Sequence, residues 1–134
     1  MTLKIRVIAP DQIVWDAEAE EIILPSSTGQ LGILTGHIPL LTALDIGVMR
    51  VRSSKEWKPI ILLGGFAEVK NNEITILVNG AEEISGINLE HAKSDLENAT
   101  NNVEEANSNK EKIEATQIMR KAKARLQAAI VINN

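Results

Sequence analysis

Glycine and proline are confined to the first part of this 134-residue chain. All eight Gly and all four Pro lie before Ile87, and residues 87–134 contain neither. Glycine and proline punctuate strands and turns, whereas a segment that lacks both can form long helices. We therefore expect an α+β protein that is mainly β, with a β domain over residues 1–86 and a helical domain over residues 87–134.

Alternation of apolar and polar residues predicts the strands of the first domain. Apolar residues at positions 3, 5 and 7 alternate with basic ones, and Ile60–Leu63 is entirely apolar, as expected for a strand covered on both faces. Pro25 is expected to end the apolar run that begins at Ile22. Further strands are expected at residues 47–52 and 74–78, with turns at 10–11, 26–29, 53–58 and 70–73. Many short strands separated by turns favour a sandwich or a flattened barrel.

Two amphipathic helices are expected in the second domain. Asn88 can cap the first helix, and Ser108–Glu111 has the S-x-x-E form of a capping box, which places a hairpin turn just before Ser108. The first apolar stripe comprises Leu89, Ala92, Leu96, Ala99, Val103 and Ala106. The second comprises Ala115, Met119, Ala122, Leu126 and Ala129, and Ile118 and Ile130 are expected to widen it.

The two stripes are rich in alanine, so each packed face gains little free energy. Burial stabilises by only about 0.8 kcal/mol per CH2-sized group, and the loss of conformational entropy opposes it. We infer a hairpin of modest stability that can leave its docking surface, and that would span about 68 Å if it straightened into one helix. A stripe of small residues can also simply let two helices pack closely, and the pattern alone leaves both interpretations open.

Four basic residues and no acidic residue follow position 119: Arg120, Lys121, Lys123 and Arg125. Such a cluster is more often a solvated surface that complements the negative end of the helix dipole. The alternative is a basic probe for an acidic surface on a partner.

The composition argues against several classes of function. The absence of Cys excludes a disulfide scaffold and a cysteine nucleophile, and two His make a dense metal cluster unexpected. A net charge of −4 and three aromatic residues argue against nucleic-acid binding. The chain has no nucleophile elbow, the spacing of Gly29 and Gly32 is too short for a phosphate loop, and the adjacent Glu82 and Glu83 are typical of solvated carboxylates. We predict a binding or regulatory module that has no cofactor and is not an enzyme.

The sequence does not predict direct membrane insertion. The longest stretch free of charged residues, Ile22–Leu44, contains two Pro and three Gly, so it cannot form a continuous spanning helix. The N-terminus has no apolar signal core. Any membrane association is therefore expected to come through a partner.

Two motifs resemble the signature of the epsilon subunit family of F-type ATP synthases. They are Gly29–Leu44, which reads GQLGILTGHIPLLTAL, and Gly64–Val69, which reads GGFAEV. The family pattern joins a G-x-x-G-[IV]-L-x-x-H-x-P-[LI] core to a later G-G-[FI]-x-E-V. The resemblance covers nearly the whole chain, and residues 5–17 look most like the cyanobacterial or chloroplast branch.

The resemblance implies a ten-stranded β-sandwich followed by an antiparallel two-helix hairpin. It implies a non-catalytic place in the central rotor, between the gamma subunit and the c-ring, peripheral on the cytoplasmic or stromal face of an energy-coupling membrane such as the thylakoid. The helices would either pack on the sandwich or rise toward the catalytic alpha and beta subunits, where the four basic residues would make contact and inhibit ATP hydrolysis. An autonomous β-platform adaptor or chaperone-like module is the alternative.

The resemblance also suggests two sets of site residues. The Gly36, His37, Ile38 and Pro39 loop would face the c-ring, where His37 bonds either to the ring or within its own chain. Some bacterial members bind ATP through an I-D-x-x-R-A motif and two later Arg residues. The matching positions here are Ile87, Asn88, His91, Lys121 and Arg125, so the Asp and two of the Arg residues are replaced. Lysine does not reproduce the bidentate fork of arginine, and we expect ATP binding that is absent or weak.

Overall fold

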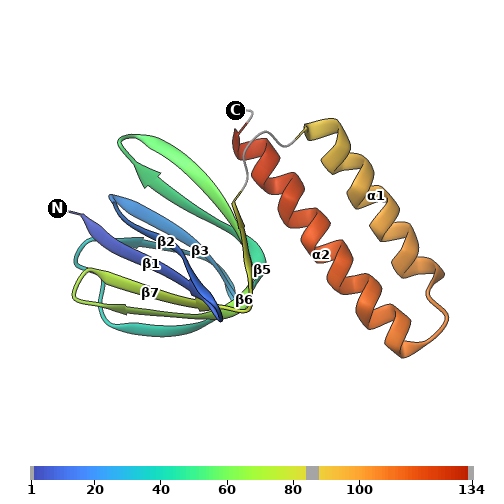
Figure 1. The fold of residues 1–134 in the computed structure, drawn as a ribbon, viewed down its shortest axis with the longest axis horizontal. Helices are drawn as coiled ribbons and strands as arrows, with labels where there is room; N and C mark the ends of the chain where they lie inside the picture. The colour runs from blue at the N-terminus through green and yellow to red at the C-terminus, as the bar shows by residue number, and fades with distance from the viewer. Residues whose placement is uncertain (1, 84–87, 133–134) are drawn as a thin grey trace.

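A β-sandwich lies beside a pair of antiparallel helices in the computed structural model, which describes residues 2–83 and 88–132 (Figure 1). The strands are β1 (Leu3–Ala9), β2 (Gln12–Ala19), β3 (Glu21–Ser26), β4 (Gly29–Leu34), β5 (Leu40–Ser53), β6 (Glu56–Lys70), β7 (Glu73–Val78) and β8 (Ala81–Glu83). The helices are α1 (Leu89–Glu105) and α2 (Asn109–Ile132). This architecture confirms the expected fold class. The expected domain boundary at residues 86 and 87 lies outside the described residues.

The sandwich is one sheet folded over itself, with the strand order β2-β1-β7-β6-β5-β3-β4 and with β8 paired to β6. Residues 40–44 of β5 pair with residues 65–69 of β6 in one layer, and residues 46–53 pair with residues 56–63 in the other. The described chain forms eight strands where the family resemblance implies ten. The count is lower because β5 and β6, 14 and 15 residues long, each continue through both layers.

Two glycines allow β6 to bend between the layers. Gly64 and Gly65 have φ angles of 83° and 153°, a region that residues with side chains rarely occupy. A Cβ atom at Gly65 would also overlap the backbone of Leu77 and Val78 on β7. The glycine pair is therefore required by the architecture of the sandwich itself.

The turns follow the sequence prediction with two differences. Asn71 and Asn72 both have positive φ, the geometry of a tight two-residue hairpin. The expected turn at residues 53–58 is confined to positions 54 and 55, because Glu56 already pairs with β5. Pro25 does not end its strand, so that expectation was wrong. The ladder between β3 and β5 is interrupted between residues 23 and 26, where the missing N–H of Pro25 removes no paired bond.

The core lies between the two layers, and a second, smaller apolar cluster lies outside them. Ile60 and Leu62 belong to the main core, whereas Ile61, which points the other way, contacts Ala124 and Ala128 of α2. All three residues of this smaller contact are 2% exposed or less. The apolar segment of β6 is thus covered on both faces, as predicted, and α2 is the element that covers the second face.

Local caps begin both helices where the sequence predicts them. The Asn88 side-chain oxygen accepts hydrogen bonds from the backbone N–H groups of Glu90 and His91, at 2.8 and 3.2 Å. The Ser108 hydroxyl accepts one from the Glu111 N–H at 3.1 Å, and the Glu111 carboxylate accepts one from the Asn107 N–H at 3.0 Å. These bonds satisfy amide groups that the first turn of a helix leaves unpaired.

Helix α2 lies between α1 and the sandwich (Figure 1). The eleven predicted stripe residues are buried or half-buried. Ile118 and Ile130 do not widen the stripe: they are 59% and 44% exposed, so that expectation was wrong. The reason is that α2 has a second apolar face, made of Ala124 and Ala128, which packs on the sheet.

The bend in β6 makes Gly65 sensitive to a single methyl group. Gly65→Ala should lower the free energy of unfolding by about 2 kcal/mol or more, because it combines an unfavourable φ with a backbone overlap. Gly32→Ala is the matched control, because a Cβ atom there meets nothing within 4 Å. Urea unfolding of both variants measures the difference, and equal stabilities would contradict the structural role of Gly65.

Candidate functional site

The helical hairpin rests on the sandwich through a small docking interface. Its apolar part is Ile61, Ala124 and Ala128, with Val48 and Leu63 at the margin. Its polar part is an ion pair between Glu82 of β8 and Arg125 of α2. Strand pairing sets Glu82 directly beside Ile61, so the apolar and polar parts adjoin.

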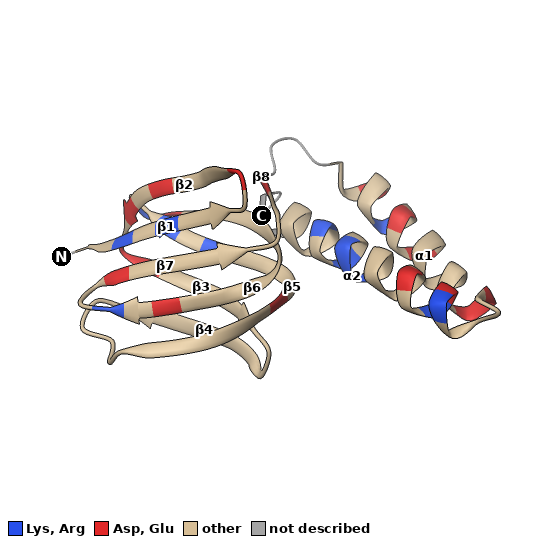
Figure 2. Cartoon of the chain, turned by 60° about the horizontal axis from the view of Figure 1, so that its bottom comes forward, with Lys and Arg blue, Asp and Glu red and all other residues tan. Residues whose placement is uncertain are grey.

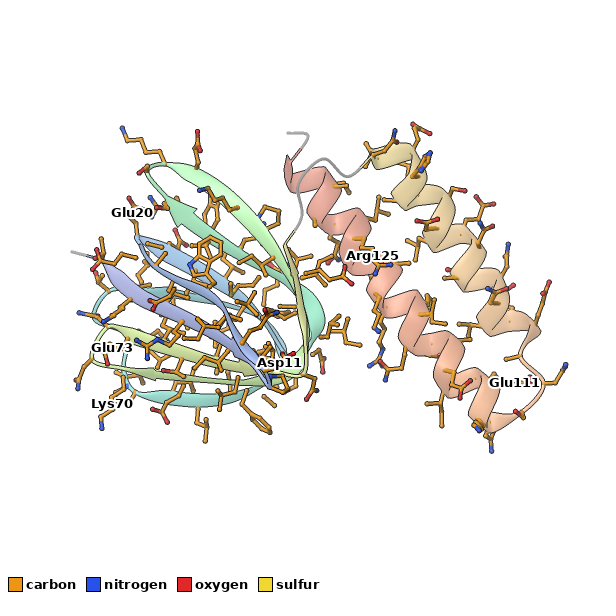
Figure 3. The ribbon with its side chains drawn as sticks, viewed as in Figure 1. Asp11, Glu20, Lys70, Glu73, Glu111 and Arg125 are labelled. Carbon is orange, nitrogen blue, oxygen red and sulfur yellow. The ribbon has the colours of Figure 1, made fainter. Side chains whose placement is uncertain are left out.

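The Glu82–Arg125 pair is bidentate. Arg125 donates from Nε to Glu82 Oε2 at 3.1 Å and from Nη2 to Oε1 at 2.8 Å. Figure 3 shows Arg125 where α2 faces the sandwich. The sequence pattern indicated a solvated carboxylate at Glu82 and did not predict this pair. The two residues are 43 positions apart, and no local pattern connects them.

The electrostatics favour the charged form of both partners. The hydrogen bonds from Arg125 lower the pKa of Glu82 against the opposing effect of partial burial, and the positive charges of Arg125 and Lys121 lower it further. The same hydrogen bonds raise the pKa of Arg125, and its attraction to Glu82 and Asp95 adds to that increase. The two side chains are 37% and 42% exposed, so solvent screening limits the pair to about 0.2–1 kcal/mol.

The four basic residues at positions 120–125 of α2 do not form one patch. Arg125 is paired with Glu82, and Lys121 is half-buried close enough to affect the same carboxylate. Arg120 and Lys123 are exposed and line a groove between α2 and the sandwich. The half of α2 next to the sandwich carries basic residues and no acidic ones (Figure 2).

Two of the positions that match the nucleotide motif, Asn88 and Arg125, have other partners in this structure. The Asn88 side chain caps α1, and His91 is exposed on that helix. Arg125 is paired with Glu82. Ile87 lies outside the described residues.

The Gly36–Pro39 loop lies at the end of the sandwich that is remote from the helices. The Gly36 N–H donates to the Asn72 side-chain oxygen at 2.7 Å, which joins the loop to the turn between Lys70 and Glu73 (Figure 3). His37 Nδ1 donates to the Ile38 carbonyl oxygen at 2.7 Å, and in the neutral ring Nε2 is then an acceptor. Ile38 is 73% exposed, so the loop carries an apolar side chain on the surface.

An apolar row that the sequence pattern did not predict crosses the outer face of the sandwich. Strand pairing aligns one residue from each of five adjacent strands: Ala43, Phe66, Leu77, Ile8 and Ile13. Phe66, Leu77 and Ile13 are 52–59% exposed. Contiguous exposed apolar side chains mark protein contacts. The signal available in the sequence was an apolar residue at strand positions where the alternation calls for a polar one.

Within residues 2–83 and 88–132, no three potential ligands among His, Asp and Glu gather as a metal site would require. No helix in the same described part of the chain is long and apolar enough to cross a membrane.

The fold and these surfaces define a docking protein, in which a β-sandwich carries a helical hairpin through a small interface. Two family models match the chain: the ATP synthase delta/epsilon chain β-sandwich domain over residues 2–84 and the long α-helix domain of the same chain over residues 85–129. The chain belongs to the ATP synthase epsilon chain family, whose members are non-catalytic rotor subunits of the synthase.

Curated relatives span both photosynthetic branches. The chain is 71% identical over 134 residues to the chloroplastic ATP synthase epsilon chain of Gracilaria tenuistipitata var. liui, which it covers completely. It is 74% identical over 129 residues to the chloroplastic chain of Pyropia yezoensis and 61% identical over 132 residues to the epsilon chain of Thermosynechococcus vestitus, with 96% of each chain covered in both comparisons. These identities confirm the family resemblance.

Solved structures share the fold at low sequence identity. A chain in the Euglena gracilis mitochondrial ATP synthase, OSCP/F1/c-ring in rotational state 1, matches with a TM-score of 0.81 and 20% identity, over 96% of this chain and 81% of the other. A chain in the Tetrahymena thermophila mitochondrial ATP synthase central stalk/c-ring matches with a TM-score of 0.63 and 16% identity, over 96% of both chains.

The Glu82–Arg125 pair should bias the hairpin toward its docked position. Glu82→Gln and Arg125→Gln should each lower the ratio of docked to undocked protein by up to about fivefold, and the double variant should add little to either. Because the chain has no Cys, spin labels at Lys58→Cys and Glu114→Cys can report the distance distribution. Glu73→Gln, at the far end of the sandwich, is the control (Figure 3).

Acidification gives a second test of the same pair. The pKa of Glu82 is lowered from its ordinary value of 4.5, so the pair stabilises docking above that pH and its contribution is lost as pH falls through the lowered pKa. Glu82→Gln should remove this part of the pH dependence. If Glu82→Gln leaves the pH dependence of docking unchanged, that dependence arises from other groups.

Proposed function

We propose that the sandwich anchors this chain to the gamma subunit and the c-ring, and that the hairpin inhibits ATP hydrolysis when it leaves the sandwich for the alpha and beta subunits. The small docking interface is the observation that carries this proposal. It comprises a buried contact with two alanines and one partly exposed ion pair. Each alanine contributes about one methyl group of burial, so undocking costs little free energy. Arg125 is exposed by undocking and joins Arg120, Lys121 and Lys123 as a basic surface.

The two remaining surfaces suit two different rotor partners. The apolar row crosses five strands and offers a broad face, which suits the gamma subunit. The Gly36–Pro39 loop is a narrow projection at the end remote from the helices, and it suits the loops of the c-ring. The names of the similar solved assemblies include a c-ring in both cases and a central stalk in one, which supports an association of this chain with those parts of a synthase.

The chloroplastic and cyanobacterial relatives support a location on a thylakoid-associated synthase. The chain would be peripheral there, on the stromal or cytoplasmic face, and held through its protein partners. The adaptor alternative has no comparable support, because both family models belong to the synthase.

ATP is not expected to control the hairpin through the degenerate motif. Lys121 and Arg125 face Glu82, a carboxylate that repels phosphate, and Asn88 cannot replace the charge of an Asp. Saturable ATP binding that is lost in His91→Ala or Lys121→Gln would contradict this proposal.

Inhibition should require the hairpin and its basic residues. In a reconstituted catalytic head with gamma, the full chain should suppress ATP hydrolysis, and a chain that ends after Gly86 should bind without suppressing it. Replacing Arg120, Lys121, Lys123 and Arg125 with Ala should relieve inhibition while binding persists, because the attraction to an acidic partner is lost. Equal inhibition by the quadruple variant would exclude the basic-probe mechanism, whereas absence of binding by every form would exclude the rotor assignment.

Mutations in the two proposed anchoring surfaces should have different effects. Phe66→Glu should weaken gamma binding by about tenfold or more, because it places a charge in the apolar row. His37→Ala should leave gamma binding intact and reduce proton pumping coupled to ATP hydrolysis in reconstituted vesicles. Ile113→Glu, a similar change at an exposed site on α2, should affect neither measurement. Normal pumping by the His37 variant would mean that His37 serves only the hydrogen bond within its own loop.

A further inference from the structure

We propose that the groove between α2 and the sandwich is a binding site for a small, multiply charged anion of the phosphate type that is free in solution. The groove has a volume of about 630 Å³, which is in the range of small-molecule sites. It lies on a different side of α2 from Lys121 and Arg125, neither of which lines it. The inference depends on the docked geometry alone and does not require the inhibitory role proposed above.

Charge is the first argument for an anion. Arg50 from β5 and Arg120 and Lys123 from α2 line the groove, and Asp45 is the one acidic residue beside them. This local excess of positive charge occurs in a chain whose net charge is −4. The ion pairs found among the described residues involve none of these three cations. Arg50 uses a single N–H group on the Gln30 side chain, at 3.1 Å, so most of its five donors are available.

The shape of the groove is the second argument. Pro25, Val48 and Ala124 provide apolar walls, and Gln30 and Gln127 add amide groups. An apolar wall reduces solvent screening, so a cation beside it attracts an anion more strongly than the same cation on an open surface. Two guanidinium groups among the cations favour phosphate oxygens, which they can bind in a bidentate manner.

The two domains both contribute cations, and this links binding to docking. Arg50 is fixed in the sandwich, whereas Arg120 and Lys123 move with the hairpin. The complete site exists only in the docked state. A ligand that binds this state alone must increase its population by mass action.

Inorganic pyrophosphate is the probe, and the full chain is the protein. Isothermal titration calorimetry at low ionic strength should show saturable binding, and Arg120→Gln/Lys123→Gln should weaken it by about tenfold or more. Lys110→Gln/Lys112→Gln removes the same charge from the same helix outside the groove and should change the affinity by less than about twofold. Asp45→Asn should tighten binding, because it removes the carboxylate that repels the ligand.

The spin-label pair at Lys58→Cys and Glu114→Cys gives an independent readout. Pyrophosphate should increase the docked population of the otherwise unaltered chain and leave that of Arg120→Gln/Lys123→Gln unchanged. Equal weakening by the two double variants would overturn the proposal, as would the absence of saturable binding. Loss of binding in Lys121→Gln with the groove variant unaffected would also overturn it. So would binding to vesicles that contain phosphatidylglycerol without binding to pyrophosphate.

Discussion

The packing of two alanines of α2 on Ile61 determines how the two domains are arranged. Ile61 belongs to a strand segment that is buried on both faces, so the outer face of the sheet needs a cover at this point. Ala124 and Ala128 let the helix backbone approach the sheet closely, which longer side chains would prevent. The same small side chains limit the area buried on each contact. The interface therefore fixes a position for the hairpin without holding it strongly.

Residues of the family motifs can be required for the fold as well as for contact with a partner. Gly65 is required because the β6 backbone bends there against β7, and no other residue fits the φ angle and the close approach together. The Gly36 loop is held in place by a hydrogen bond to Asn72, a residue outside either motif. A motif residue can thus be explained by the fold before any partner is considered. The stronger candidates for partner contact are the side chains that the fold leaves exposed, such as Ile38 and Phe66.

Local signals predicted the features that depend on neighbouring residues, and failed where distant segments meet. The glycine and proline distribution predicted a β region followed by helices, and the Asn88 and Ser108 caps were correct because capping acts within one helical turn. Ile118 and Ile130 were misplaced because one helical period cannot describe a helix that packs on two sides. The Glu82–Arg125 pair could not be predicted, because it joins strand β8 to a helix across 43 positions. The exposed apolar row could not be predicted for the same reason, since only the strand register brings its five residues together.

In the proposed function, Arg125 has a role in both positions of the hairpin. In the docked state it is paired with Glu82, and its charge stabilises the interface; in the undocked state the same charge is available to an acidic partner. A partner needs only to replace one partly screened ion pair and a small apolar contact, which together amount to a few kcal/mol. An acidic surface can supply that much through several weak contacts. The apolar row and the Gly36–Pro39 loop belong to the sandwich and contain no residue of α2, so movement of the hairpin leaves both anchoring surfaces intact. In the function proposed above, anchoring and inhibition are therefore separable in energy.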